Sequence, residues 1–130
     1  MTAACLTLLA QADDAIWPWE HTSGGTLLVE AFPAAQLLTW GLHFQGYSGN
    51  EIDARRKREI IVEYLRSRVQ MAAVHVTELV HSADALDAVI AAFAGIAVIE
   101  KRLRDQPDGP VRSEGWIAVH DDARALSQWL

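Results

Sequence analysis

The sequence has little cysteine, no long hydrophobic run and no excess of positive charge. Cys5 is the only cysteine of the 130 residues, which excludes a disulfide framework and a cysteine-based zinc site within one chain. No apolar run approaches the roughly 20 residues that cross a bilayer. Residues 1–10 are apolar but lack the basic start of a signal peptide. We therefore expect a cytoplasmic protein with no membrane partner.

Several common catalytic and binding patterns are also missing. The chain has no Walker loop, no dinucleotide fingerprint and no Ser-His-Asp order. Its formal net charge of −6 means that its overall field does not favour nucleic acid. The charge is uneven, because six of the 11 Lys and Arg residues fall between Arg55 and Arg68. Any phosphate-binding surface should therefore be local.

What is present indicates one globular α/β domain over residues 1–130. The composition is 51% hydrophobic and 22% charged, which is typical of a folded chain with a single core. No internal repeat is visible, and no linker is long enough to separate two domains. We expect a predominantly helical α/β domain that represents only part of a larger fold.

The best strand candidate covers residues 26–32, with a shorter C-terminal strand at 116–120. Residues 26–32 (TLLVEAF) are apolar on both faces except at Glu30, which fits a strand covered on both sides. Such a central strand needs neighbours on both edges. The sequence offers too few, so the missing strands would come from an absent N-terminal segment or from another chain.

Apolar periodicity predicts helices in much of the remaining chain. The predicted helices cover residues 1–14, 34–40, 51–70, 83–103 and 121–130, while 71–79 fits either a helix or a strand. Asn50 and Ser82 are the expected N-caps of the two longest helices.

The helix at 83–103 has the clearest pattern. One stripe comprises Leu86, Val89, Ile90, Phe93, Ile96 and Ala97. The opposite face carries the small residues Ala88, Ala91, Ala92 and Gly95, so we expect this helix to be buried on two sides.

Three carboxylates are candidate catalytic and metal-binding residues. Glu30 ends an apolar strand, and Asp84 and Asp87 are three residues apart in the first turns of a helix. Carboxylates near strand ends and helix starts hold the cations of two-metal nucleases, and oxygen ligands suit Mg²⁺ or Mn²⁺. The structural alternative stays open, because the helix dipole alone favours Asp84 and Glu30 could cap the following helix.

The run Arg55, Arg56, Lys57 and Arg58 is the candidate nucleic-acid-binding segment. Four cations in the first turns of a helix oppose its macrodipole. A bound phosphate would offset that cost, as a nucleic-acid backbone contact does. The alternative is a solvated charged face.

Other polar and aromatic residues are weaker candidates. His75, Glu78 and His81 do not have zinc-protease spacing, because the two histidines point to different sides of a helix. The five tryptophans could stack on bases, but packing in a core or over a surface left by missing strands fits them better.

Five short motifs, in order over residues 17–120, resemble one family of predicted bacterial and archaeal nucleases. They are Ile16-Trp17-Pro18-Trp19, Val29-Glu30-Ala31-Phe32-Pro33-Ala34, Gly46-Tyr47-Ser48-Gly49 in the loop from Leu42, Ser82-Ala83-Asp84-Ala85-Leu86-Asp87-Ala88, and Glu114-Gly115-Trp116-Ile117. Together they are similar to the domain of unknown function 429, a family assigned to the RNase H-like superfamily.

The resemblance implies a metal-dependent phosphodiesterase with Glu30, Asp87 and Asp84 as ligands. The family opens with a strand carrying "D-x-G-x-x-G-G-W", whose Asp is its principal metal ligand, and nothing in residues 1–15 matches it. Ser48 stands where the family has a loop lysine. We therefore expect only the C-terminal portion of the fold, with catalysis by this chain alone in doubt.

Two functions from different classes follow from the sequence. The first is a metal-dependent nuclease-like domain that acts on nucleic-acid phosphodiesters. The second is a non-catalytic interaction module that forms a homo-oligomer, or that pairs with a separate N-terminal segment through an exposed strand edge.

Overall fold

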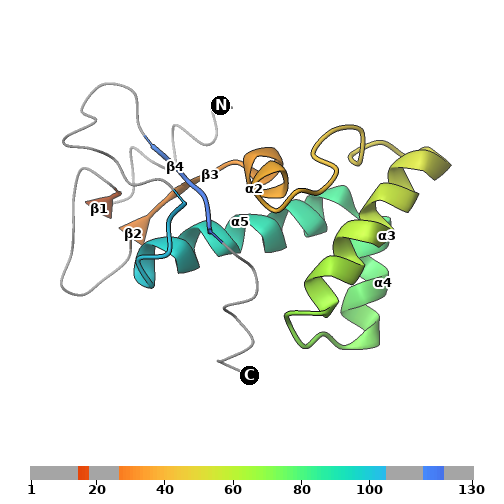
Figure 1. Cartoon of the computed structure of the whole chain (residues 1–130). Coiled ribbons are helices and arrows are strands. Elements are labelled where there is room, and N and C mark those ends of the chain that lie inside the picture. The colour runs from red at the N-terminus through yellow and green to blue at the C-terminus, as the bar shows by residue number, and fades with distance from the viewer. Residues whose placement is uncertain (1–14, 18–26, 105–115, 122–130) are drawn as a thin grey trace.

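The computed structural model describes residues 15–17, 27–104 and 116–121, and these form a mixed α/β fold dominated by four helices (Figure 1). The predicted fold class is confirmed. The described elements in chain order are β1 (Ala15–Ile16), β2 (Leu27–Leu28), β3 (Glu30–Ala31), α2 (Pro33–Thr39), α3 (Ile52–Arg66), α4 (Ala73–His81), α5 (Ala83–Ile99) and β4 (Ile117–Ala118). The helices predicted at 1–14 and 121–130, and Cys5, lie outside the described residues.

The predicted central strand forms as two short strands, β2 and β3, separated by Val29. β1 pairs in parallel with β2, and β4 pairs in parallel with β3. Trp17 N also donates a hydrogen bond of 2.9 Å to Leu28 O. The chain itself therefore supplies a neighbour for each half of the segment, one from before it and one from near the C-terminus.

Helix α5 runs along the middle of the fold and connects two apolar clusters (Figure 1). Leu86, Ile90 and Phe93 of this helix pack in a cluster shared with α2, α3 and α4. Ala94, further along the helix, packs with Trp17, Ala118 and the inward side chains of the strands. The long apolar stripe thus serves two cores, one helical and one at the sheet.

The prediction that α5 is covered on its small-residue face as well is wrong for much of that face. Ala88 and Ala92 are exposed, and a Cβ atom added at Gly95 would meet nothing within 4 Å. The helix is therefore packed from one broad side. Small residues permitted a close neighbour here, but the described part of the chain provides none.

The segment at 71–79 that fitted either structure forms helix α4, which ends where α5 begins. Ser82 lies between them, and its Oγ accepts a hydrogen bond of 3.1 Å from Ala85 N, as the predicted N-cap should. Asn50 is not the N-cap of α3, because the helix begins one residue later and Glu51 occupies that position. No single helix in the described residues is long and apolar enough to cross a membrane; α4 and α5 together have the length and composition, but they are bent by 111°.

Helix α2 is tied to the C-terminal strand by one buried side chain. Pro33 occupies its first turn, which suits a residue without an N–H donor. Gln36 is 3% exposed, and its Nε2 donates to His120 O at 2.9 Å while His120 N donates to its Oε1 at 2.8 Å. The side-chain amide of Gln36 therefore bonds both the N–H and the C=O of His120, as the backbone of a neighbouring strand would.

Candidate functional site

The loop at 42–50, between α2 and α3, is held in place by the buried side chain of Arg58. Only 4% of Arg58 is exposed. Its Nη1 donates to Gly49 O at 2.8 Å and to Tyr47 O, and its Nε donates to Val80 O at 2.8 Å. One guanidinium on α3 thus joins the loop to the last turn of α4.

The same loop reaches helix α5 through Tyr47. This side chain is 6% exposed, and its hydroxyl donates a hydrogen bond of 2.7 Å to Oδ1 of Asp87. Burial raises the pKa of the Tyr47 phenol above its ordinary value, and the hydrogen bond to Asp87 and the charge of that carboxylate raise it further. The phenol is therefore a fixed neutral donor at physiological pH.

Asp84 and Asp87 lie one turn apart at the start of α5. Asp84 is exposed, and Asp87 is half-buried beneath the loop. The positive end of the helix dipole favours both carboxylates. The tyrosine fixes one oxygen of Asp87, which leaves the remaining lone pairs of the carboxylate able to accept further ligands.

Glu30 occupies a different part of the molecule. It is exposed on β3, and its flanking residues Val29 and Ala31 pack in the cluster that contains Ala94. Ala94 lies seven residues beyond Asp87, which corresponds to about 10 Å along a helix axis. Glu30 is therefore associated with the second half of α5, whereas the two aspartates lie at its start.

The resemblance implies a metal site formed by the three carboxylates of Glu30, Asp84 and Asp87. Among the described residues, no group of three or more His, Cys, Asp or Glu side chains could hold a metal ion. Glu30 does not join Asp84 and Asp87 in one ligand set. The pair of aspartates meets a smaller requirement, because Mg²⁺ often takes one or two carboxylates and completes its shell with water and substrate phosphate.

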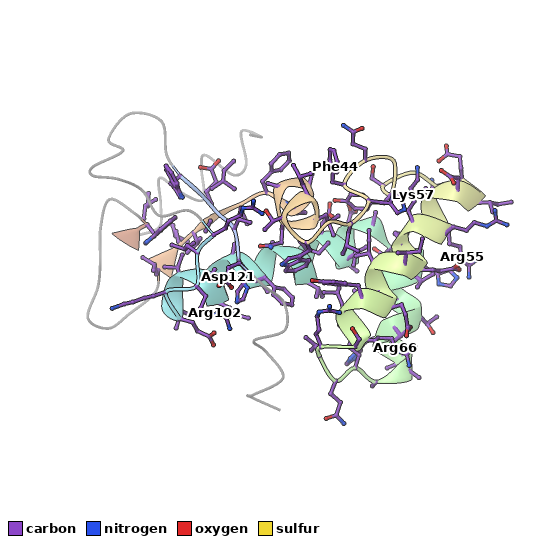
Figure 2. The ribbon with its side chains drawn as sticks, in the orientation of Figure 1. Phe44, Arg55, Lys57, Arg66, Arg102 and Asp121 are labelled. Atoms are coloured by element: carbon purple, nitrogen blue, oxygen red, sulfur yellow. The ribbon has the colours of Figure 1, made fainter. Side chains whose placement is uncertain are left out.

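The structure separates the four consecutive cations of α3. Arg58 is buried in its contact with the loop. The basic surface of α3 therefore consists of Arg55, Arg56 and Lys57. Arg55 Nε lies 3.5 Å from Glu59 Oε1, while Lys57 Nζ lies 2.8 Å from Asp53 Oδ2 (Figure 2). Within the described residues, Arg56 has no ion-pair partner.

The cations of α3 change the acidity of the exposed Asp53 carboxyl beside them. The hydrogen bond from Lys57, and then its charge, lower the pKa of the Asp53 carboxyl, and Arg56 and His43 contribute in the same direction. Positive charge from α3 and a histidine from the loop therefore surround one exposed carboxylate.

The remaining candidates have structural positions. His81 is exposed, and its Nδ1 lies 2.8 Å from Thr77 O in the same helix. Trp17 is buried, and Trp40 stacks on Tyr64 and meets the edge of Phe93. Trp17 and Trp40 both pack against the apolar clusters, in agreement with the prediction that tryptophans pack in a core.

The comparison with protein families covers four of the five motifs and ends before Glu114-Gly115-Trp116-Ile117. A family model described as "Protein of unknown function (DUF429)" matches residues 1–112. The chain belongs to the DUF429 family. No curated protein matches the sequence, and no solved structure matches it.

Sequence reasoning named both residues that organise the site of this DUF429 chain but not their roles, because it assigned Arg58 to nucleic-acid binding and gave Tyr47 only as part of a family motif. Arg58 carried a detectable signal, because it lies three, four and seven residues before the buried Ile61, Val62 and Leu65. That spacing places it on the apolar stripe of α3. Tyr47 had no comparable signal, since its partner Asp87 is 40 residues away.

Proposed function

We propose that this DUF429 chain is an RNase H-like, nuclease-type domain that acts on nucleic-acid phosphodiesters with the help of Mg²⁺ or Mn²⁺. One observation supports this proposal above the others. The carboxylate of Asp87 is held at the start of α5 by a 2.7 Å hydrogen bond from Tyr47, next to the exposed Asp84.

The chemistry of the pair suits a hard cation. Carboxylate oxygens are the preferred ligands of Mg²⁺ and Mn²⁺, and a ligand whose orientation is already fixed loses less freedom on binding. Tyr47 fixes Asp87, while Asp84 projects from the previous turn. A bound cation would polarise a phosphoryl oxygen and generate the water nucleophile. Glu30 is not included in this ligand pair because it lies near the other half of α5.

The basic surface of α3 supplies the second requirement, which is a contact to the phosphate backbone. Arg56 and Lys57 are the residues we assign to this role, with Arg55 beside them. Such contacts position the nucleic acid without reading its sequence. Arg58 is not assigned to it, because its donors are used by the loop and α4.

Thermal unfolding with and without divalent cation tests the proposal. We expect Mn²⁺ or Mg²⁺ to raise the Tm of the wild type by several degrees, because a ligand that binds only the folded state stabilises it. Asp87→Asn should lose most of this shift. Glu63→Gln, which changes an exposed acid on α3, is the matched control and should keep the shift.

Two results would contradict the proposal. Equal shifts in the wild type and in Asp87→Asn would remove Asp87 from the cation site. Absence of metal-dependent cleavage of both RNA and DNA oligonucleotides by the wild type, in an assay sensitive enough to detect one turnover, would remove the nuclease activity.

A second candidate function is supported by the outer side of the small sheet. Side chains alternate along a strand, so Glu30 and Phe32 face away from α5, as does Ile117 on β4. Phe32 is 53% exposed and Ile117 is 40% exposed. An apolar sheet face of this kind suits a self-association module, and the molar mass in solution tests it.

A further inference from the structure

The loop at 42–50, which lies against Lys57 of α3, displays an exposed aromatic side chain. Phe44 is 37% exposed. Lys57 reaches the same loop, because its Nζ lies 3.0 Å from where a Cβ atom on Gly46 would stand. Figure 2 shows Phe44 and Lys57 along the same upper edge of the molecule, one on the loop and the other on α3.

The loop that carries Phe44 is fixed before any ligand arrives. Arg58 holds the carbonyls of Tyr47 and Gly49, and Tyr47 is in turn bonded to Asp87 on α5. Gly46 has φ +69°, a backbone conformation that glycine adopts at low cost. A preorganised loop can present an aromatic ring to a ligand without an added ordering cost.

We infer that this loop and the start of α3 form a binding site for single-stranded nucleic acid, in which one base stacks on Phe44 and neighbouring phosphates contact Lys57 and Arg56. The inference rests on the proposed function and names its substrate class. An exposed ring next to cations is the arrangement by which proteins hold single strands without reading their sequence. A duplex offers its phosphates but not its base faces, so it cannot use Phe44.

Asp53 sets the strength of this site. Its carboxylate lies 2.8 Å from the Lys57 ammonium, so a phosphate must compete with it. Removing the carboxylate should strengthen binding, whereas removing either cation should weaken it.

Fluorescence anisotropy with a short labelled single strand, and with the matching duplex, tests the inference. The measurement is made in EDTA at low salt, so that it is independent of any cation site. We expect Phe44→Ala to weaken binding of the single strand about tenfold, which is within the range for loss of one stacked base, and to leave duplex binding unchanged. Phe44→Trp should keep the affinity.

Two charge variants and a control complete the experiment. Asp53→Asn should tighten binding several-fold, and Lys57→Gln should weaken it and reduce its salt dependence. Ile60→Ala, which truncates an exposed apolar residue on the same helix, should bind as the wild type does.

The inference is overturned if the single strand does not bind, if it binds no better than the duplex, or if Phe44→Ala binds it as tightly as the wild type. These outcomes are independent of the metal experiment. Stacking on Phe44 with no metal response would contradict the nuclease proposal alone. A metal response and cleavage without Phe44-dependent binding would contradict this inference alone.

Discussion

Tyr47 links the loop to the candidate catalytic carboxylate, and its phenol makes the link sensitive to alkaline pH. In the folded chain its pKa is raised by burial and by Asp87, whereas in the unfolded chain it titrates at about 10. Below that pH both states are protonated and the contribution of Tyr47 to stability is complete. Above it the unfolded state loses its proton first, so stability falls as the pH rises.

We therefore expect the wild type to lose stability more steeply above about pH 10 than Tyr47→Phe, which keeps the buried ring and removes the ionisable group. Urea unfolding at a series of alkaline pH values measures this difference. Tyr64→Phe is the matched control for loss of one tyrosine. Parallel pH profiles for the wild type and Tyr47→Phe would show that the phenol titrates normally.

At the residue scale, the sequence indicates which side chains are polar but not which hydrogen bonds they form in the folded chain. Asp84 and Asp87 are recognisable as acidic residues at the start of a helix, and the structure places them there. That Asp87 accepts a hydrogen bond from Tyr47 depends on how the loop folds back onto α5. Likewise, the distance between Glu30 and the aspartates depends on which part of α5 the strand packs against.

Arg58 shows how one residue on α3 acts at the scale of elements. It connects α3, the loop and α4 through three carbonyl oxygens, in one buried and two partly buried hydrogen bonds. Buried carbonyls that lose a charged donor have no replacement from solvent, and each costs about 1–3 kcal/mol. Lysine cannot replace the planar, forked group at all three positions.

We expect Arg58→Met to lower the free energy of unfolding by about 3 kcal/mol or more, and Arg58→Lys to be nearly as harmful. Arg56→Met, at an exposed position two residues earlier, should change it by less than about 0.5 kcal/mol. Urea denaturation of the three variants gives the comparison. Similar stabilities for Arg58→Met and Arg56→Met would mean that the loop does not depend on this side chain.

The positions of the described helices follow from local patterns more closely than those of the strands do, since the predicted strand at 26–32 forms as two short pieces. Pro33 at the start of α2 and Ser82 between α4 and α5 have the positions that their chemistry predicts. The sequence of residues 71–79 fits either a helix or a strand. Contact of its apolar side with α3 and α5 decides in favour of the helix.

At the scale of the whole molecule, two apolar clusters lie along α5. Among the described residues, nine buried side chains form the helical cluster and three form the sheet cluster. The described strands are also short, with two residues each. Short strands of this kind are stabilised by added apolar contact.

A second copy of the chain would supply such contact through the outer face of the sheet. We expect the wild type to show a molar mass that rises with concentration above that of one chain, measured by size-exclusion chromatography with light scattering. Phe32→Ser combined with Ile117→Ser should keep the protein monomeric, because both exposed apolar side chains on that face are removed. Ile99→Ser changes a more exposed apolar residue at the end of α5 and should leave the association intact. A wild type that stays monomeric at every concentration would exclude self-association and leave the nucleic-acid function as the remaining candidate.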